Sequence, residues 1–164
     1  MLSGVSPHAS ECCEETREAP NKRRLQFCLM VANHKPYVVT PQSWKTVAAT
    51  WINLFRDPGY VRVNDKPLLI FFSVSSLVQE FGTAGAVRQA LDSLRQAAAN
   101  EGLKGVTMAV CVGPSEVKEA EACGFDALTG YNYHVVGFTP GQEANPIQQM
   151  LDGDRRIWER ISGG

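Results

Sequence analysis

Four short apolar runs, separated by segments with helical patterns, constrain this chain more than any other feature. Each run has the length of a buried strand and ends at polar or turn-forming residues. The chain between the runs leaves room for right-handed crossovers, which favours a parallel sheet. The order β-α-β-α-β-α-β-α therefore predicts an α/β fold built on four strands: Leu25–Ala32, Pro67–Ser73, Val106–Val112 and Ala127–Tyr133. The first run is apolar on both faces, which predicts a strand covered on both sides.

The clearest helical pattern begins at Thr40-Pro41, where a capping residue precedes a proline at the first helical position. Apolar residues then recur at i, i+3, i+4, i+7, i+8 and i+11, on one helix face, until Asp57-Pro58-Gly59 ends the helix. These residues are Trp44, Val47, Ala48, Trp51, Ile52 and Phe55.

Three further helices are predicted along the chain. The first carries Val87, Leu91, Leu94 and Ala98, and a short one ends at Cys123 before Gly124. Asn145-Pro146 begins the last, whose apolar positions are Ile147, Met150, Leu151, Ile157, Trp158 and Ile161. Before the second strand, Tyr60–Val63 is predicted to be extended and to turn at Asn64-Asp65.

Two architectures fit this order of elements: an open, doubly wound parallel sheet, or half of a (β/α)₈ barrel. A complete barrel needs about 250 residues, so four consecutive βα units would make a partial (half) barrel. Open sheet edges and an unfilled inner face predict self-association, another partner or the missing half. Residues 1–24 have little periodicity and are predicted to be a poorly ordered head, with residues 25–164 forming the domain.

Composition excludes several classes of partner and cofactor. The formal net charge of −1 gives no electrostatic reason to expect nucleic acid or an anionic membrane. No apolar run approaches the roughly 20 residues of a membrane helix. No signal peptide is visible, so the cytoplasm is the default expectation. The five cysteines include no CxxC pair, and no glycine-rich phosphate motif follows a strand, so neither a metal nor a cofactor is expected.

Polar and aromatic residues follow two of the predicted strands, at the edge where parallel sheets bind ligands. Asn33, His34 and Tyr37 follow the first strand, and the fourth ends in Tyr131, Asn132, Tyr133 and His134. Aromatic rings stack on the apolar face of a sugar, while amides and imidazoles pair with its hydroxyls. The residues alone leave a second interpretation open, in which the rings fill gaps between strand and helix and the amides cap turns.

Carboxylates are poorly placed for glycoside hydrolysis, which ordinarily needs two of them flanking the bond. Asp57, Asp65 and Asp126 are predicted at the opposite edge of the sheet. Glu143, in the loop after the fourth strand, is a weak candidate for a catalytic group, and Glu80 is a weaker one. No acid/base pair is therefore predicted.

Three blocks of the sequence resemble the WbsX-like glycoside hydrolases, the family 99-like group related to endo-α-mannosidases. The blocks are "FCLMVANH", "FRDPGYVRVNDKPLLIFF" and "GFDALTGYNYH". The most specific part is Asp-Pro-x-Tyr-x-x-Val followed by Lys-Pro, carried here by Asp57, Pro58, Tyr60, Val63, Lys66 and Pro67. Of these, Asp57, Tyr60, Lys66 and Pro67 are interpreted as structural residues that fix the turn before the second strand.

The resemblance implies a (β/α)₈ barrel that acts on a polysaccharide or glycan, with an α-mannoside as one option. It implies sugar contacts at Asn33 and His34, and at Tyr131 and the residues after it. The family's catalytic glutamates lie in a Trp-rich block that has no counterpart here. We therefore expect a partial chain that binds substrate and is inactive alone. The alternative is a non-catalytic carbohydrate-binding or interaction module.

Overall fold

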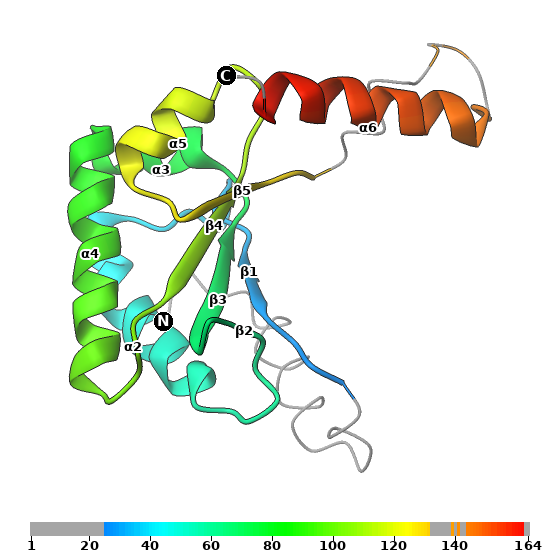
Figure 1. Cartoon of the computed structure of the whole chain (residues 1–164). Coiled ribbons are helices and arrows are strands. Elements are labelled where there is room, and N and C mark those ends of the chain that lie inside the picture. Colours follow the sequence, from blue (N-terminus) through cyan, green and yellow to red (C-terminus); the bar gives the residue numbers. More distant parts are fainter. Residues whose placement is uncertain (1–24, 132–138, 140, 142–143, 163–164) are drawn as a thin grey trace.

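The computed structural model describes residues 25–131, 139, 141 and 144–162, which form an open α/β sheet with helices (Figure 1). The parallel strands are β1 (Leu29–Val31), β3 (Lys66–Phe71), β4 (Thr107–Cys111) and β5 (Ala127–Thr129), and β2 (Arg62–Val63) pairs antiparallel with β3. The helices are α2 (Pro41–Phe55), α3 (Val74–Phe81), α4 (Ala84–Asn100), α5 (Val117–Cys123) and α6 (Ile147–Ser162).

The sheet confirms the predicted alternation of strands and helices. Its order is β1-β3-β4-β5, so each parallel strand lies beside the next one in the chain. This singly wound order is compatible with part of a (β/α)₈ barrel, and the described strands do not close on themselves. Residues 1–24, predicted to be a poorly ordered head, lie outside the described residues.

The two longest predicted helical patterns are confirmed residue by residue. Thr40 caps α2, and the six buried residues of this helix are the six that the periodicity placed on one face. The buried residues of α4 are likewise Val87, Leu91, Leu94 and Ala98. Asn64 and Asp65 have φ of 51° and 66°, the left-handed conformation of the tight turn predicted between β2 and β3.

One helix was not predicted. α3 is a single eight-residue helix between Ser73, whose hydroxyl accepts the Ser76 N–H at 3.1 Å, and Gly82 at its end. Eight residues are too few to establish a helical period against the neighbouring apolar strand. The serine cap and the terminal glycine were the signals that could have revealed it.

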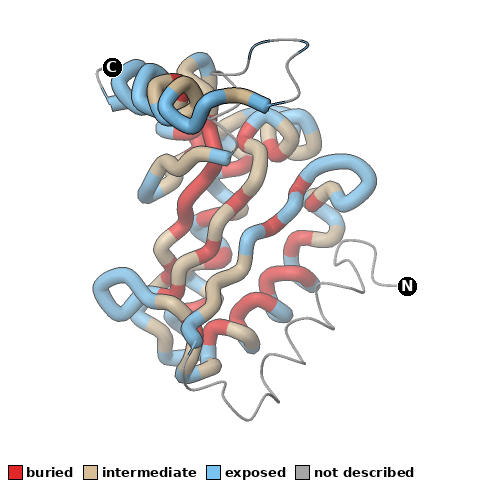
Figure 2. Tube along the Cα trace, turned by 90° about the vertical axis from the view of Figure 1, so that its right-hand side faces the viewer, coloured by how far each residue is buried: buried red, intermediate tan, exposed pale blue. Residues whose placement is uncertain are grey.

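The core lies on one face of the sheet, between the strands and helices α2, α4 and α5 (Figures 1 and 2). Phe71 of β3 is fully buried at its centre. The ring of Phe71 lies 5.8 Å from that of Trp51 and 5.7 Å from that of Phe125, both edge to face. Trp44 adds a stacked contact at 6.4 Å. This aromatic cluster joins α2 and the segment before β5 to the central strand.

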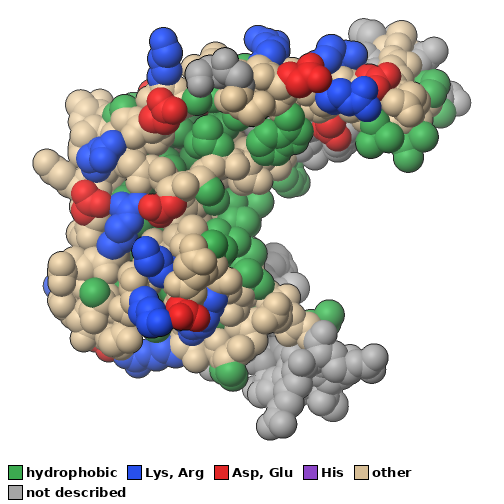
Figure 3. All heavy atoms as spheres, viewed as in Figure 1, with side chains coloured by type: hydrophobic (Ala, Val, Ile, Leu, Met, Phe, Trp, Pro, Cys, Tyr) green, Lys and Arg blue, Asp and Glu red, His purple; other side chains and the backbone are tan. Residues whose placement is uncertain are grey.

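The described residues cover the opposite face of the sheet only in part, and the exposure of Met30 shows that the prediction of a first strand covered on both sides is wrong. Met30, Ile70, Ala109 and Ala127 are paired in register across the four parallel strands and share this face. Met30 is 38% exposed and Ala127 is also exposed. We call this surface the open face. Figure 3 shows hydrophobic side chains gathered along the hollowed side of the molecule, beneath α6.

Helix α6 buries less of its apolar surface than its sequence predicted. Gly153, Ile157 and Ile161 are buried, whereas Ile147 and Leu151 are 70% and 49% exposed. The carboxyl-terminal half of α6 thus contacts the core while its first turns extend past the sheet (Figure 1). Among the described residues, no helix combines the length and apolar character that a membrane crossing requires.

Phe71 and Phe72 provide a matched pair for testing which face carries the stability. Phe71→Ala should lower the free energy of unfolding by about 3–5 kcal/mol, because it empties the aromatic cluster. Phe72→Ala, on the open face, should cost only about 1 kcal/mol. Urea titrations followed by circular dichroism measure both, and equal losses would contradict this one-sided core.

Candidate functional site at the carboxyl edge of the sheet

Three aromatic side chains form a row at the carboxyl edge of the sheet. His34 follows β1, Phe72 follows β3 and Tyr131 follows β5. The ring centroids of His34 and Phe72 are 5.1 Å apart, and those of Phe72 and Tyr131 are 5.0 Å apart with planes at 72°. We call these residues the rim row. Phe72 neighbours Phe71 in the chain, so strand alternation turns it toward the open face.

Asn33 lies behind the rim row and joins the ends of β1 and β3. Its side chain is 1% exposed, and Asn33 is the buried polar residue among those described. Its Oδ1 accepts the backbone N–H groups of Phe72 at 2.9 Å and Ser73 at 3.1 Å, while Nδ2 donates to the Ser73 carbonyl at 2.6 Å. These three hydrogen bonds fix the backbone on which the Phe72 ring is mounted.

His34 and Tyr37 lie in a tight turn after β1. The Tyr37 N–H donates to the His34 carbonyl at 2.6 Å, and the turn contains a cis Lys35–Pro36 bond. His34 Nδ1 lies 2.9 Å from the Lys35 carbonyl oxygen, which can only accept, so Nδ1 donates, and in the neutral imidazole Nε2 is an acceptor. Both side chains are exposed at the edge of the sheet. The imidazole can therefore accept a hydrogen bond from a ligand hydroxyl.

Tyr131 is 52% exposed and stands at the other end of the rim row. The three residues that follow it, Asn132, Tyr133 and His134, lie outside the described residues, and so does Glu143. The sequence thus contributes His34 and Tyr131 to the row, whereas it missed Phe72. The signal that could have revealed Phe72 is the pair of adjacent phenylalanines, which cannot both face one core in a strand.

Three aspartates have structural contacts at the amino edge of the sheet or its hairpin. Asp126 accepts the Met108 N–H at 2.8 Å and pairs with Arg95 at 3.0 Å. Asp57 accepts the Gly59 N–H at 2.8 Å in the turn after α2. Lys104 donates to Asp65 at 2.6 Å, and this hydrogen bond lowers the pKa of Asp65.

Glu116 is a carboxylate at the carboxyl edge that the sequence did not suggest. It is the N-cap residue of α5, just beyond β4, and its Oε2 accepts the Gly113 N–H at 2.8 Å. Glu80, the weaker candidate of the sequence, lies in the last turn of α3. Among the described residues, no three His, Cys, Asp or Glu side chains gather closely enough to hold a metal ion.

The cysteines of the sheet and helices are poorly suited to act as nucleophiles. Burial raises the pKa of the Cys28 and Cys111 thiols, and it raises that of Cys123 to about 11. Glu119 contributes to the shift of Cys123 through charge repulsion. A thiol with a raised pKa carries little of the reactive thiolate at neutral pH.

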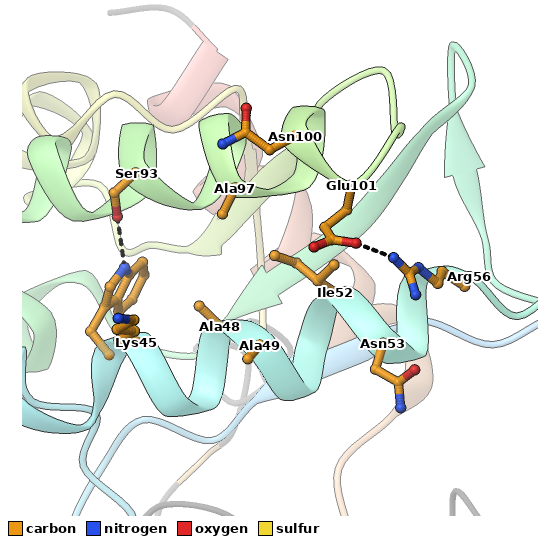
Figure 4. A pocket seen from close by; sticks show the side chains of 11 residues that line it. Lys45, Ala48, Ala49, Ile52, Asn53, Arg56, Ser93, Ala97, Asn100 and Glu101 are labelled. Carbon is orange, nitrogen blue, oxygen red and sulfur yellow. Dashed lines mark hydrogen bonds and ion pairs between the residues drawn. The ribbon is translucent and has the colours of Figure 1, made fainter.

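A groove of about 630 Å³ lies elsewhere, between α2 and α4 on the helical side of the sheet (Figure 4). Ala48 and Ala97 line it, and the Arg56–Glu101 ion pair closes one end. The Trp44 indole donates to Ser93 Oγ at 3.0 Å at the other end. The groove contains no pair of carboxylates, and the sheet separates it from the open face.

Comparison with known proteins identifies the chain's family. The model of a family described as "Glycosyltransferase WbsX" matches residues 30–157. The chain belongs to the WbsX family. Membership makes it a carbohydrate-active protein whose expected partners are glycans. No curated protein and no solved structure gives a match. The matched segment of this WbsX family member includes the whole rim row, from His34 to Tyr131.

Removing the amide that joins β1 and β3 should destabilise the protein. Asn33→Ala leaves two backbone N–H groups and one carbonyl without their partner, so we expect a loss of about 2–4 kcal/mol in the free energy of unfolding. Asn53→Ala, at an exposed position of α2, is the matched control and should change little. Chemical denaturation of both variants measures this, and equal stabilities would contradict the role of Asn33.

Alkaline pH should destabilise the protein through Cys123. The folded-state pKa of about 11 exceeds the ordinary value of 9.0, so the stabilising contribution is complete below pH 9 and is lost as the pH rises toward 11. Cys123→Ala removes this titration, so its free energy of unfolding should fall less over that interval than that of the wild type. Urea titrations at several pH values test this, and parallel pH profiles would contradict it.

Proposed function

We propose that the rim row binds a glycan, with His34, Phe72 and Tyr131 as contact residues. The observation that carries this proposal is the continuous row of three rings at the carboxyl edge of a parallel sheet. Rings at this spacing offer stacking surfaces to a sugar, and His34 Nε2 offers a hydrogen-bond acceptor to a hydroxyl. In this proposal Asn33 is a positioning residue, because its polar atoms are already bonded to β3.

The other predicted residues extend the same proposal. Tyr37, 41% exposed in the turn after β1, would flank the His34 end of the row. Asn132, Tyr133 and His134 directly follow Tyr131 in the sequence, lie outside the described residues, and are proposed as further glycan contacts from the sequence alone. We also propose that residues 25–164 form the folded unit that holds this surface.

For the reaction class, we infer a relation to glycoside hydrolysis, with α-mannosides as the first substrates to test. The support is the sequence resemblance, whereas the matching family carries the description of a glycosyltransferase. Hydrolysis ordinarily requires two carboxyl groups about 5–10 Å apart across the bond. Glu116 is a described carboxylate at the correct edge of the sheet, and Glu143 is a further candidate.

A non-catalytic binding module is the second candidate. It is favoured by the hydrogen bond that Glu116 accepts from Gly113, which gives this carboxylate a structural use, and by the aspartates at the amino edge. In both candidates the 164 residues bind a glycan and do not cleave it. The two candidates therefore share the first experiment.

Loss of a rim ring should weaken binding of an α-mannan oligosaccharide. Tyr131→Ala should raise the dissociation constant about 3- to 10-fold, the equivalent of one stacking contact. Tyr131→Phe keeps the ring and should bind nearly as the wild type does. Titration calorimetry against a panel of oligosaccharides measures these constants, and a Tyr131→Ala variant with unchanged affinity for every bound glycan would contradict the proposed site.

The same preparations test for turnover. Incubation with the bound oligosaccharide, followed by chromatography of the products, should give no cleavage above a protein-free control. Cleavage that Glu116→Gln or Glu143→Gln abolishes would instead assign hydrolysis to this chain and identify its acid.

A further inference from the structure

The rings of the rim row do not lie in one plane. The ring planes of His34 and Phe72 cross at 58°, and those of Phe72 and Tyr131 cross at 72°. The second pair meets edge to face, which is one of the arrangements that aromatic pairs prefer. Turning these two rings into one plane would therefore lose a favourable contact between them. The rim row is an angled surface made of separate ring faces.

The twist of the sheet contributes to this angle. The strand order is β1-β3-β4-β5, so His34 and Tyr131 follow strands that are three steps apart in the sheet. Neighbouring strands are rotated by about 20–25° relative to one another, which amounts to roughly 60–75° over three steps. The points at which the two outer rings are attached to the backbone are consequently rotated relative to one another. The angle of the row is therefore built into the fold.

Among the described residues, the exposed ring surface of the row lies mainly at its two ends. His34 is exposed and Tyr131 is 52% exposed, whereas Phe72 between them is half-buried. The backbone of Phe72 is fixed in turn, because its N–H donates to Asn33 Oδ1 at 2.9 Å. Phe72 thus acts as a spacer that sets the angle between the two exposed rings.

This geometry restricts the shape of the glycan that the row can hold. An aromatic ring stacks on the apolar face of one sugar unit. A straight β-1,4-linked chain is a flat ribbon, so several rings can stack on it together only when they share a plane. In a bent chain, successive sugar faces point in different directions, as the rings of the rim row do.

We propose that the rim row recognises a bent, soluble glycan chain, with different sugar units contacting its two ends, and does not bind the flat face of a straight polysaccharide. This inference rests on the proposed function, because it specifies the ligand of the same site. In it, Phe72 is a positioning residue that determines specificity for chain shape.

Pairs of tetrasaccharides that differ only in linkage test the proposal. Mannotetraose and glucotetraose are each titrated calorimetrically in a bent, α-linked form and in a straight, β-1,4-linked form. The bent form of the sugar that binds should have a dissociation constant about 3- to 10-fold lower, because the straight form can stack on one ring only. Phe72→Ala should bring this ratio close to one, whereas Phe72→Tyr keeps the ring and should preserve the ratio. A ratio of two affinities does not change when part of a variant is merely unfolded.

Co-sedimentation with microcrystalline cellulose, chitin and insoluble β-1,4-mannan is the second measurement. The protein should remain in the supernatant, as an inert control protein does. A straight tetrasaccharide bound as tightly as its bent isomer, or co-sedimentation that Tyr131→Ala abolishes, would overturn the inference and leave the glycan site in place. Affinities for the tetrasaccharides that Tyr131→Ala leaves unchanged would instead contradict the proposed function, and absence of binding to all four would overturn both.

Discussion

The packing of Phe71 against α2 and the segment before β5 is the contact on which the rest of the structure depends. It places the core on one side of the sheet, where Trp44 and Trp51 cover it. Because successive side chains of a strand point to opposite faces of the sheet, Phe72 faces the opposite side. The same contact that stabilises the fold thus exposes an aromatic ring at the edge of the sheet. Phe71, which stabilises the core, and Phe72, which belongs to the candidate site, are thus neighbours in the sequence.

Asn33 converts this arrangement into a defined edge. A buried amide is costly unless its polar atoms are paired, and here three hydrogen bonds to Phe72 and Ser73 compensate that cost. Because the partners are backbone groups just beyond β3, the bonds fix the position of the end of β3 relative to the end of β1. The ring of Phe72 and the turn that carries His34 are consequently fixed relative to one another. In the proposed glycan site, the amide would act through this geometry and not through contact with the ligand.

The sequence predicted those parts of the fold that repeat over several turns. The buried face of α2 followed from six periodic residues, and that of α4 followed from four. The prediction failed for α3, which spans only about two helical turns. It also failed on the open face, where the burial of a strand depends on other elements. An apolar strand such as β1 has the same sequence pattern whether one or both of its faces are covered. Met30 therefore gave no local signal of its exposure.

The candidate site, like the fold, could be predicted from the sequence only in part. The rule that ligands approach the carboxyl ends of parallel strands selected His34 and Tyr131 without structural knowledge. It could not select Phe72 or Glu116, because a phenylalanine within an apolar run and a glutamate in a short helix both have ordinary structural explanations. Asn33 was selected for the right edge, but only the structure reveals its bonds to β3. Sequence patterns thus indicate which edge of the sheet carries the candidate site, whereas the hydrogen bonds of the structure show what each residue contacts there.

Binding and bond cleavage make different demands on such an edge. Stacking needs only rings held at the correct spacing, which the ends of β1, β3 and β5 provide through strand pairing and the hydrogen bonds of Asn33. Cleavage needs a carboxyl group whose protonation can change during the reaction, and therefore one that is not occupied as a structural acceptor. Glu116 accepts a backbone N–H, so proton transfer by this group would compete with the turn that it stabilises. The proposal of a glycan-binding role for the rim row therefore does not depend on Glu116 acting as a catalytic group.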